Sequence, residues 1–252
     1  MSATANAAQP ELTPIGRELS LLTSTDGYER WAPTYDHAPN PLLAREERYL
    51  LPLLAEWRGK SVLDLACGTG RWLEKLVAHA GDRSVGIDRS AAMLRVAEEK
   101  TAIRSRLARA ACENLPFRSF AFDLAICSFS VGHIPDLPLM VRELARVLKP
   151  GGDVFVSDLH SEAFDRGWRV GFRDEHTSIQ IEMQPRTAEQ LVRTFYANGF
   201  ECLTYVPLCL GRAEQPIFVR AEKAHLFADA CKFPAILICH FKRLPVRRFN
   251  SD

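Results

Sequence analysis

The residues best placed for chemistry lie at two predicted turns in the first half of the chain. Residues 62–70 read V-L-D-L-A-C-G-T-G, an apolar run with one aspartate, Asp64, that leads into a turn with Gly68 and Gly70. Glycines in such a turn adopt positive φ and let a ligand approach the backbone closely. The next apolar run ends in Asp88, whose carboxylate either accepts the hydroxyls of a ribose or caps the following helix. We expect ribose binding, because the glycine turn precedes it.

A glycine-rich turn alone does not separate a nucleoside site from the site of a nicotinamide-dependent dehydrogenase. A dehydrogenase fingerprint that begins at Gly68 needs a third glycine at position 73, where this chain has Leu73. The turn is also not followed by the lysine of a phosphate-binding loop. We therefore expect a ligand without a pyrophosphate, and a nicotinamide-dependent reductase is the first alternative.

Apolar runs and amphipathic stretches alternate along the rest of the chain. Strands are predicted at 61–66, 84–88, 106–110, 122–129, 154–159, 200–207 and 235–242. Helices are predicted at 71–80, after Ser90 as N-cap, at 137–148 and at 187–198, with a turn at 149–152. Strands that alternate with helices of this length imply βαβ units. The prediction is an α/β fold with a doubly wound, mostly parallel, seven-stranded sheet.

The length of 252 residues suits one large α/β domain. Residues 1–24 are small and polar, so we expect a flexible N-terminus followed by a single domain at 25–252. Residues 25–58 are aromatic and then helical, and we expect them to form a lid over the site. The alternating pattern is lost at 161–186, where we expect an insertion that covers part of the pocket.

Composition restricts the partners and the compartment. The net charge of +1 gives no basic face for nucleic acid, and no apolar run approaches the ~20 residues that span a bilayer. The seven cysteines are odd in number and form no C-x-x-C pair, which favours reduced thiols over disulfides or a metal site. We therefore expect a cytoplasmic protein with no nucleic acid, no membrane insertion and no metal. The oligomeric state is not predicted.

Several motifs are similar in order and spacing to those of the class I S-adenosylmethionine-dependent methyltransferases. The similarity is greatest to the subgroup of ubiquinone/menaquinone-biosynthesis and malonyl-carrier-protein methyltransferases. The motifs are Y-x-x-W-A-x-x-Y-D at 28–36, D-L-A-C-G-T-G at 64–70, V-G-I-D-R-S-A-A-M-L at 85–94, E-N-L-P-F at 113–117, F-D-L-A-I-C-S-F-S-V-G-H-I-P-D at 122–136 and E-L-A-R-V-L-K-P-G-G at 143–152. The resemblance implies a Rossmann-like methyltransferase fold and methyl transfer from S-adenosylmethionine, with S-adenosylhomocysteine as product.

The resemblance also implies which residues bind the cofactor. They are Tyr28 and Tyr35 in the lid, Asp64, Ala66, Gly68 and Gly70 at the methionine end, Asp88 at the ribose, Arg89, Met93, Cys112 and Glu113 around the adenine, and the carbonyl of Ser128 near the sulfonium. Two positions depart from the family pattern. Ala66 replaces the first glycine of the turn, which we expect to be tolerated. Ala111 replaces an acidic residue, so the adenine amine needs Glu113 or a backbone carbonyl instead.

For the acceptor we expect a small organic or carrier-bound molecule, such as a quinone precursor, methylated at carbon or oxygen. His133, in the loop after the fourth strand, is the candidate general base. His160 follows the fifth strand and is a weaker candidate, while His176 and Trp168 belong to the insertion. Tyr28, Trp31 and Tyr35 either pack the lid or form a cation-binding wall. A non-catalytic S-adenosylmethionine-binding or scaffold protein is the second alternative.

Overall fold

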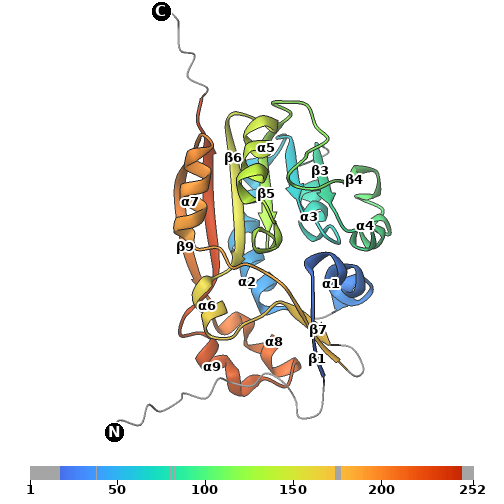
Figure 1. The fold of residues 1–252 in the computed structure, drawn as a ribbon, viewed down its shortest axis with the longest axis vertical. Coiled ribbons are helices and arrows are strands. Elements are labelled where there is room, and N and C mark those ends of the chain that lie inside the picture. The colour runs from blue at the N-terminus through green and yellow to red at the C-terminus, as the bar shows by residue number, and fades with distance from the viewer. Residues whose placement is uncertain (1–17, 38, 80, 82, 174–176, 246–252) are drawn as a thin grey trace, which may run out of the picture.

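All seven of the predicted strands belong to one central sheet. The computed structural model describes residues 18–37, 39–79, 81, 83–173 and 177–245. The strand order is β4-β3-β2-β5-β6-β10-β9 (Figure 1). The strands are β2 (Val62–Leu65), β3 (Ser84–Asp88), β4 (Leu107–Arg109), β5 (Phe122–Ser128), β6 (Leu148–Leu159), β9 (Phe200–Cys209) and β10 (Pro234–Arg243). The five strands from β4 to β6 are parallel, and β10 runs antiparallel to both of its neighbours.

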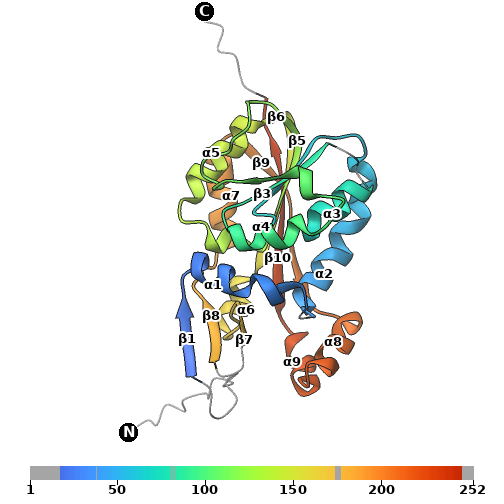
Figure 2. The same ribbon diagram turned by 90° about the vertical axis from the view of Figure 1, so that its right-hand side faces the viewer.

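Helices cover both faces of this sheet, which confirms the doubly wound α/β architecture (Figure 2). The α-helices are α1 (Ser24–Trp31), α2 (Pro41–Leu50), α3 (Arg71–His79), α4 (Ala91–Glu98), α5 (Leu137–Val147), α6 (Ser161–Asp165), α7 (Ala188–Ala197), α8 (Gln215–Arg220) and α9 (Phe227–Ala230). The 3₁₀ turns are η1 (Ala32–His37), η2 (Leu51–Trp57), η3 (Arg104–Arg106), η4 (Val131–His133), η5 (Arg212–Glu214) and η6 (Ala224–Leu226). Leu144 and Phe195 of α5 and α7 join the core on one face, and Leu50 and Trp72 of α2 and α3 join it on the other.

Local side-chain chemistry explains where the helices near the site begin. Ser90 is the N-cap of α4, as predicted, and its hydroxyl accepts a hydrogen bond from the backbone N–H of Met93. Asn40 caps α2 in the same way, and Pro41 occupies the first turn, where no backbone donor is needed. These caps fix the starts of two helices that border the carboxyl edge of the sheet.

The predicted turn at 149–152 lies inside strand β6. Pairing with β5 begins at Leu148, opposite Phe122, and resumes at Asp153, opposite Leu124. The four residues between them therefore bulge out of the ladder, with Gly151 at a φ of 77°. The helix before this segment, α5, ends at Val147, one residue before its predicted end, and the strand begins at Leu148, earlier than predicted.

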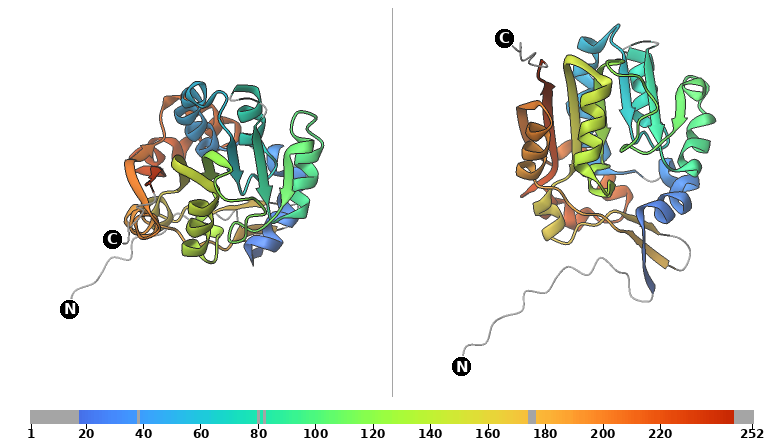
Figure 3. Two further views of the ribbon diagram at one scale, coloured as in Figure 1. Left: turned by 90° about the horizontal axis from the view of Figure 1, so that it is seen from above. Right: turned by 45° about the horizontal axis from the view of Figure 1, so that its top comes forward.

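The prediction of a flexible segment at 1–24 is wrong for its last residues, while residues 1–17 lie outside the described part. Residues Glu18–Leu22 form strand β1, which pairs in parallel with β8 (Thr177–Ile181), and β8 pairs with β7 (Gly171–Arg173). This second, three-stranded sheet lies beyond the carboxyl edge of the main sheet (Figure 3). Strand β1 and the two strands of the predicted insertion at 161–186 thus form one small sheet beyond this edge.

The sequence analysis did not predict a second group of elements at this end of the molecule. The chain between β9 and β10 forms η5, α8, η6 and α9, which lie at the same end of the molecule as the small sheet (Figure 1). Phe218 of α8 and Ala230 of α9 are buried in the core cluster that also holds Leu50 of α2. The predicted lid at 25–58 is helical, and its α1 and η1 pack on α4 through Tyr28, Tyr35 and Met93.

The turn before α3 yields a stability prediction. Gly70 has a φ of 82°, and a Cβ there would lie 2.3 Å from Cδ1 of the fully buried Ile103. We expect Gly70→Ala to lower the free energy of unfolding by about 1 kcal/mol from backbone strain and by a further ~1–3 kcal/mol from overpacking. Urea denaturation measures the loss.

The matched control is Gly59→Ala, because Gly59 has a φ of 76° and open space where its Cβ would be. It should lose only the backbone contribution, about 1 kcal/mol. If both variants lost the same free energy of unfolding, the Ile103 side chain would have moved aside, and packing would not restrict position 70.

Candidate active site

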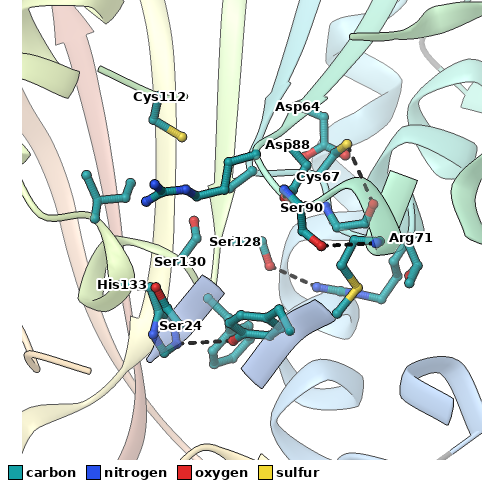
Figure 4. A pocket seen from close by; sticks show the side chains of 18 of the residues that line it. Ser24, Asp64, Cys67, Arg71, Asp88, Ser90, Cys112, Ser128, Ser130 and His133 are labelled. Atoms are coloured by element: carbon teal, nitrogen blue, oxygen red, sulfur yellow. Dashed lines mark hydrogen bonds between the residues drawn. The ribbon is translucent and has the colours of Figure 1, made fainter. Parts of the chain in front are cut away.

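A cavity lies at the carboxyl ends of β2, β3 and β5 and beneath the lid, with about 970 Å³ of space that is partly open to solvent (Figure 4). It is lined by His133 and by all of the predicted cofactor residues except Gly70. Those that line it are Tyr28, Tyr35, Asp64, Ala66, Gly68, Asp88, Arg89, Met93, Cys112, Glu113 and Ser128. In a parallel α/β sheet this is the edge at which ligands bind.

Gly70 is the exception, and its place in the structure differs from the prediction. The position of its absent Cβ is directed at Ile103 and Ala97, which belong to the packing behind the turn. Its N–H donates to the carbonyl of Cys67, and its own carbonyl accepts from Glu74 in the first turn of α3. Gly70 therefore closes the turn and starts the helix, and it does not form the cavity wall.

The backbone is strained at two non-glycine positions of the cavity wall. Ala66 has a φ of 57° and Phe129, directly after β5, has a φ of 49°. A side chain in this left-handed region costs about 1 kcal/mol, and such residues cluster at functional sites. Ala66 therefore adopts a conformation that favours glycine, the residue it replaces in the family pattern.

Asp88 connects the two turns of the cavity. Its Oδ2 accepts from the backbone N–H of Gly68 at 2.8 Å, and its Oδ1 accepts from that of Ser90, also at 2.8 Å. Burial raises the pKa of this carboxyl, while these N–H groups act in the opposite direction. Each carboxylate oxygen has a further lone pair. Asp88 therefore supports the helix start and can still accept hydrogen bonds from a ligand.

Asp64 is buried in the cavity wall, and its Oδ2 has no hydrogen-bond partner within the described residues. Burial raises the pKa of its carboxyl to about 7, against the opposing influence of Arg71. An unpaired buried carboxylate is costly unless a donor or a cation satisfies it. The atom therefore marks where a positively charged ligand group fits.

The sequence analysis missed a carboxylate behind the cavity, Glu46 of α2, which is fully buried. Its Oε1 accepts from the hydroxyls of Ser128 and Ser157, and its Oε2 accepts from Arg71 at 2.5 Å and from Trp72 at 3.1 Å. The Ser128 hydroxyl is thus part of a network, in addition to the backbone role predicted for this residue. The sequence gives no sign that separates Glu46 from the neighbouring glutamate, since both lie in one polar stretch of a helix.

His133 is hydrogen-bonded at both ring nitrogens. Its Nδ1 lies 2.9 Å from the carbonyl of Glu182, and its Nε2 lies 3.1 Å from the hydroxyl of Tyr28 (Figure 4). A carbonyl only accepts, so Nδ1 carries the proton and the unprotonated Nε2 accepts from Tyr28. Burial lowers the pKa of His133 and raises that of Tyr28, which keeps both groups neutral.

His160, Trp168 and Trp31, the other candidates that the structure describes, lie outside the cavity wall. His160 accepts from the N–H of Glu162 through Nδ1 and lies 2.8 Å from the hydroxyl of Tyr205 through Nε2, so it caps α6. Trp168 packs on Phe233, and His176 lies outside the described residues. Trp31 stacks on Phe172 at 5.1 Å, which joins the lid to the small sheet and does not form a cation-binding wall at the cavity.

Comparison with known proteins agrees with this geometry. Residues 62–152 match a family described as a methyltransferase domain. A 2-phytyl-1,4-naphtoquinone methyltransferase of Synechococcus elongatus is 33% identical over 145 residues, which cover 53% of this chain and 62% of that protein. A demethylmenaquinone methyltransferase of Bacillus licheniformis is 39% identical over 101 residues, which cover 38% of this chain and 44% of that protein. The matched part thus spans less than two thirds of either relative.

The comparison with solved structures shows the fold. The crystal structure of an S-adenosylmethionine-dependent methyltransferase from Mesorhizobium loti superposes with a TM-score of 0.62 at 22% identity, covering 81% of this chain and 100% of that one. The chain therefore has the Rossmann-like fold of the S-adenosylmethionine-dependent methyltransferases, and its residues 62–152 match a methyltransferase domain. Within the described ranges, no helix combines the length and the apolar character needed to cross a bilayer.

The cavity residues fit the cofactor of this class. The unpaired Oδ2 of Asp64 suits the ammonium group of a methionine moiety, and the remaining lone pairs of Asp88 suit ribose hydroxyls. The turn at Ala66 and Gly68 provides the close backbone approach, since nothing lies within 4 Å of the position where Gly68 would carry a Cβ. Cys112 and Glu113, which follow Ala111, both line the cavity.

The raised pKa of Asp64 predicts that cofactor affinity depends on pH. Below about pH 7 this carboxyl is protonated and cannot attract an ammonium group. We expect the affinity for S-adenosylhomocysteine to rise as the pH increases from about 5.5 to about 7.5, a range in which the ligand amine stays protonated. Isothermal titration calorimetry at several pH values measures the change.

Two controls separate Asp64 from other titrating groups. 5′-Methylthioadenosine has no amino acid part, so its affinity should stay constant over the same range. Asp64→Asn should bind S-adenosylhomocysteine weakly at every pH. If both ligands followed the same pH curve, the dependence would arise elsewhere in the cavity.

Proposed function

We propose that this protein transfers a methyl group from S-adenosylmethionine to a small organic acceptor that carries a hydroxyl group, at oxygen or at an adjacent carbon. The observation that carries the proposal is the cavity itself, in which Asp64 and Asp88 face the same space as the Tyr28–His133 pair. When bound, the cofactor supplies an electrophilic methyl group. The protein's part is to orient two ligands and to accept a proton in a site covered by the lid.

The Tyr28–His133 pair sets the path of that proton. Tyr28 donates to Nε2 of His133, so the remaining lone pairs of the Tyr28 oxygen can accept from an acceptor hydroxyl. As the acceptor proton moves to Tyr28, the Tyr28 proton passes to Nε2, while Nδ1 remains bound to the carbonyl of Glu182. His133 is thus a general base that acts through Tyr28. Loss of the hydroxyl proton makes both the oxygen and an adjacent ring carbon more nucleophilic.

The rest of the wall supports an apolar acceptor. Leu43, Phe129, Ile134 and Pro135 also line the cavity, and pockets of this kind bind metabolites with few polar groups. Two relatives are named as methyltransferases of 2-phytyl-1,4-naphtoquinone and of demethylmenaquinone, so a hydroquinone is the first acceptor to test. A cytoplasmic location stays a prediction, supported by seven free cysteines.

Ligand binding tests the proposal directly. We expect the wild-type protein to bind S-adenosylhomocysteine and to bind neither oxidised nor reduced nicotinamide dinucleotide in calorimetric titrations. Asp88→Ala should weaken S-adenosylhomocysteine binding at least tenfold, because a buried ribose and the Gly68 N–H both lose an acceptor. A wild-type protein that binds the dinucleotide and not S-adenosylhomocysteine would refute the proposal and restore the reductase alternative.

Turnover tests the role of the proton path. With labelled S-adenosylmethionine and a naphthohydroquinone, His133→Ala and Tyr28→Phe should each lower kcat about 100-fold, which is within the usual contribution of a general base. Affinity for S-adenosylhomocysteine should change little in His133→Ala. The matched control is His160→Ala, which removes a histidine from outside the cavity wall and should retain full activity. Unchanged turnover in His133→Ala would eliminate the proton path.

A further inference from the structure

The two groups of the proposed proton path belong to segments that meet at one close contact. Tyr28 follows Gly27 in helix α1. His133 donates through Nδ1 to the carbonyl of Glu182, the residue after strand β8. A Cβ at Gly27 would lie 2.7 Å from Cγ1 and 3.0 Å from Cδ1 of Ile181, the last residue of β8. The backbone of α1 therefore rests directly on the residue that precedes Glu182.

This contact explains why position 27 is a glycine. Gly27 lies inside α1 and is buried, and its φ is not positive, so the backbone conformation does not require glycine. Glycine is also one of the least favourable residues in a helix interior. Ile181 is only 1% exposed, so its side chain has little room to move away from a larger residue. The glycine thus allows α1 to approach β8 as closely as its backbone can.

Glu182 connects the small sheet to both groups of the pair. Its N–H donates to the carbonyl of Leu22, the last residue of β1, at 2.8 Å, and its own carbonyl accepts from His133. Only Thr23, the N-cap of α1, separates β1 from the helix that carries Tyr28 (Figure 2). The pairing of β1 with β8 therefore places α1 and the carbonyl that orients the histidine ring at the same time.

The turn η4, which carries His133, is held independently of α1. The N–H of Gly132 donates to Oδ2 of the buried Asp158 at 2.8 Å, and the carbonyl of Gly132 accepts from the N–H of Gln184 at 2.8 Å. A displacement of α1 would therefore move the Tyr28 hydroxyl away from Nε2 of His133, which lies 3.1 Å from it. This distance is near the upper end of the usual range, so a displacement of about 1 Å would break the hydrogen bond.

We propose that Gly27 and Ile181 are positioning residues whose contact sets the hydrogen bond between the Tyr28 hydroxyl and Nε2 of His133. The inference rests on the proposed function, in which this pair takes up the acceptor proton, and it names the contact that keeps the pair together. Two carbon atoms in contact lie about 3.5–4.0 Å apart. An alanine Cβ at 2.7 Å from Ile181 would therefore displace α1 by about 1 Å.

The pKa of His133 reports this hydrogen bond without any acceptor. Tyr28 donates to the unprotonated Nε2 and so stabilises the neutral ring, which means that loss of the hydrogen bond raises the pKa. We expect Tyr28→Phe and Gly27→Ala each to raise the pKa of His133 by about 0.5–1 pH unit. In the Tyr28→Phe protein, Gly27→Ala should cause no further rise. NMR titration of the imidazole nitrogens measures these values, and His133→Ala assigns the signal.

Exchange of volume between the two positions tests the contact itself. With labelled S-adenosylmethionine and a naphthohydroquinone, Gly27→Ala should lower kcat about 10- to 100-fold, the effect of a displacement of about 1 Å. Its affinity for S-adenosylhomocysteine should change little. Ile181→Ala removes all three carbon atoms that the new Cβ would meet. In the double variant Gly27→Ala/Ile181→Ala, both kcat and the pKa of His133 should therefore return toward the wild-type values.

Two single variants complete the experiment. Ile181→Ala alone removes the surface on which α1 rests, so it should also raise the pKa of His133 and lower kcat. It carries the test if Gly27→Ala does not fold. The matched control is Gly211→Ala, because Gly211 has an extended backbone with a φ of −139° and its Cβ would lie 3.7 Å from the nearest atom, on Glu214. This control should behave as the wild type does.

The possible failures are distinct. If Tyr28→Phe raised the pKa of His133 and Gly27→Ala did not, or if the two effects were additive, the inference would be overturned. Lack of recovery in the Gly27→Ala/Ile181→Ala protein would also overturn it. An unchanged pKa in Tyr28→Phe would remove the hydrogen-bonded pair and the inference with it. If the wild-type protein did not bind S-adenosylhomocysteine, the proposed function would fail, whereas the pKa values would still show whether the contact sets the pair.

Discussion

The buried carboxylate of Glu46 is the interaction on which the arrangement of the site depends. It joins α2 to α3 through Arg71 and Trp72, and to the ends of β5 and β6 through Ser128 and Ser157. A carboxylate in this environment is stable only while its donors stay in place, because each lost hydrogen bond leaves a buried charge partly unpaired. The network therefore links helix α2, the start of helix α3 and the two central strands β5 and β6.

The part of the fold that the sequence predicted is the part governed by local patterns. The run that ends in Asp88 forms its strand at the predicted residues, and Ser90 caps the next helix through its own hydroxyl. Both outcomes follow from side-chain periodicity and capping, which act over a few residues. The same holds for the cavity wall, because parallel strands bring their carboxyl ends to one edge whatever lies between them.

What the sequence did not predict depends on contacts between distant segments. Strand β1 exists because it pairs with β8, whose residues 177–181 are distant in sequence, and a five-residue run gives no sign of such a partner. The buried role of Glu46 depends on Ser128 and Ser157, and neither is near it in sequence. The motif predicted that Gly70 lines the cavity, because a motif fixes only the spacing of residues along the chain. In the structure the Cβ position of Gly70 is directed at Ile103, on the other side of the turn.

The two ends of the cavity, one at Asp64 and one at the Tyr28–His133 pair, differ in the charge of their side chains. This difference fits the proposed chemistry. At the end of the cavity beneath the glycine turn, burial raises the pKa of the Asp64 carboxyl to about 7, so its charge depends on pH and on the ligand beside it. At the acceptor end Tyr28 and His133 are neutral before reaction, since burial opposes charge on either ring. Proton uptake by His133 then replaces the positive charge that disappears when the sulfonium is consumed. The net charge of the enclosed site stays constant, so the reaction does not require a new unpaired charge in a low-dielectric cavity.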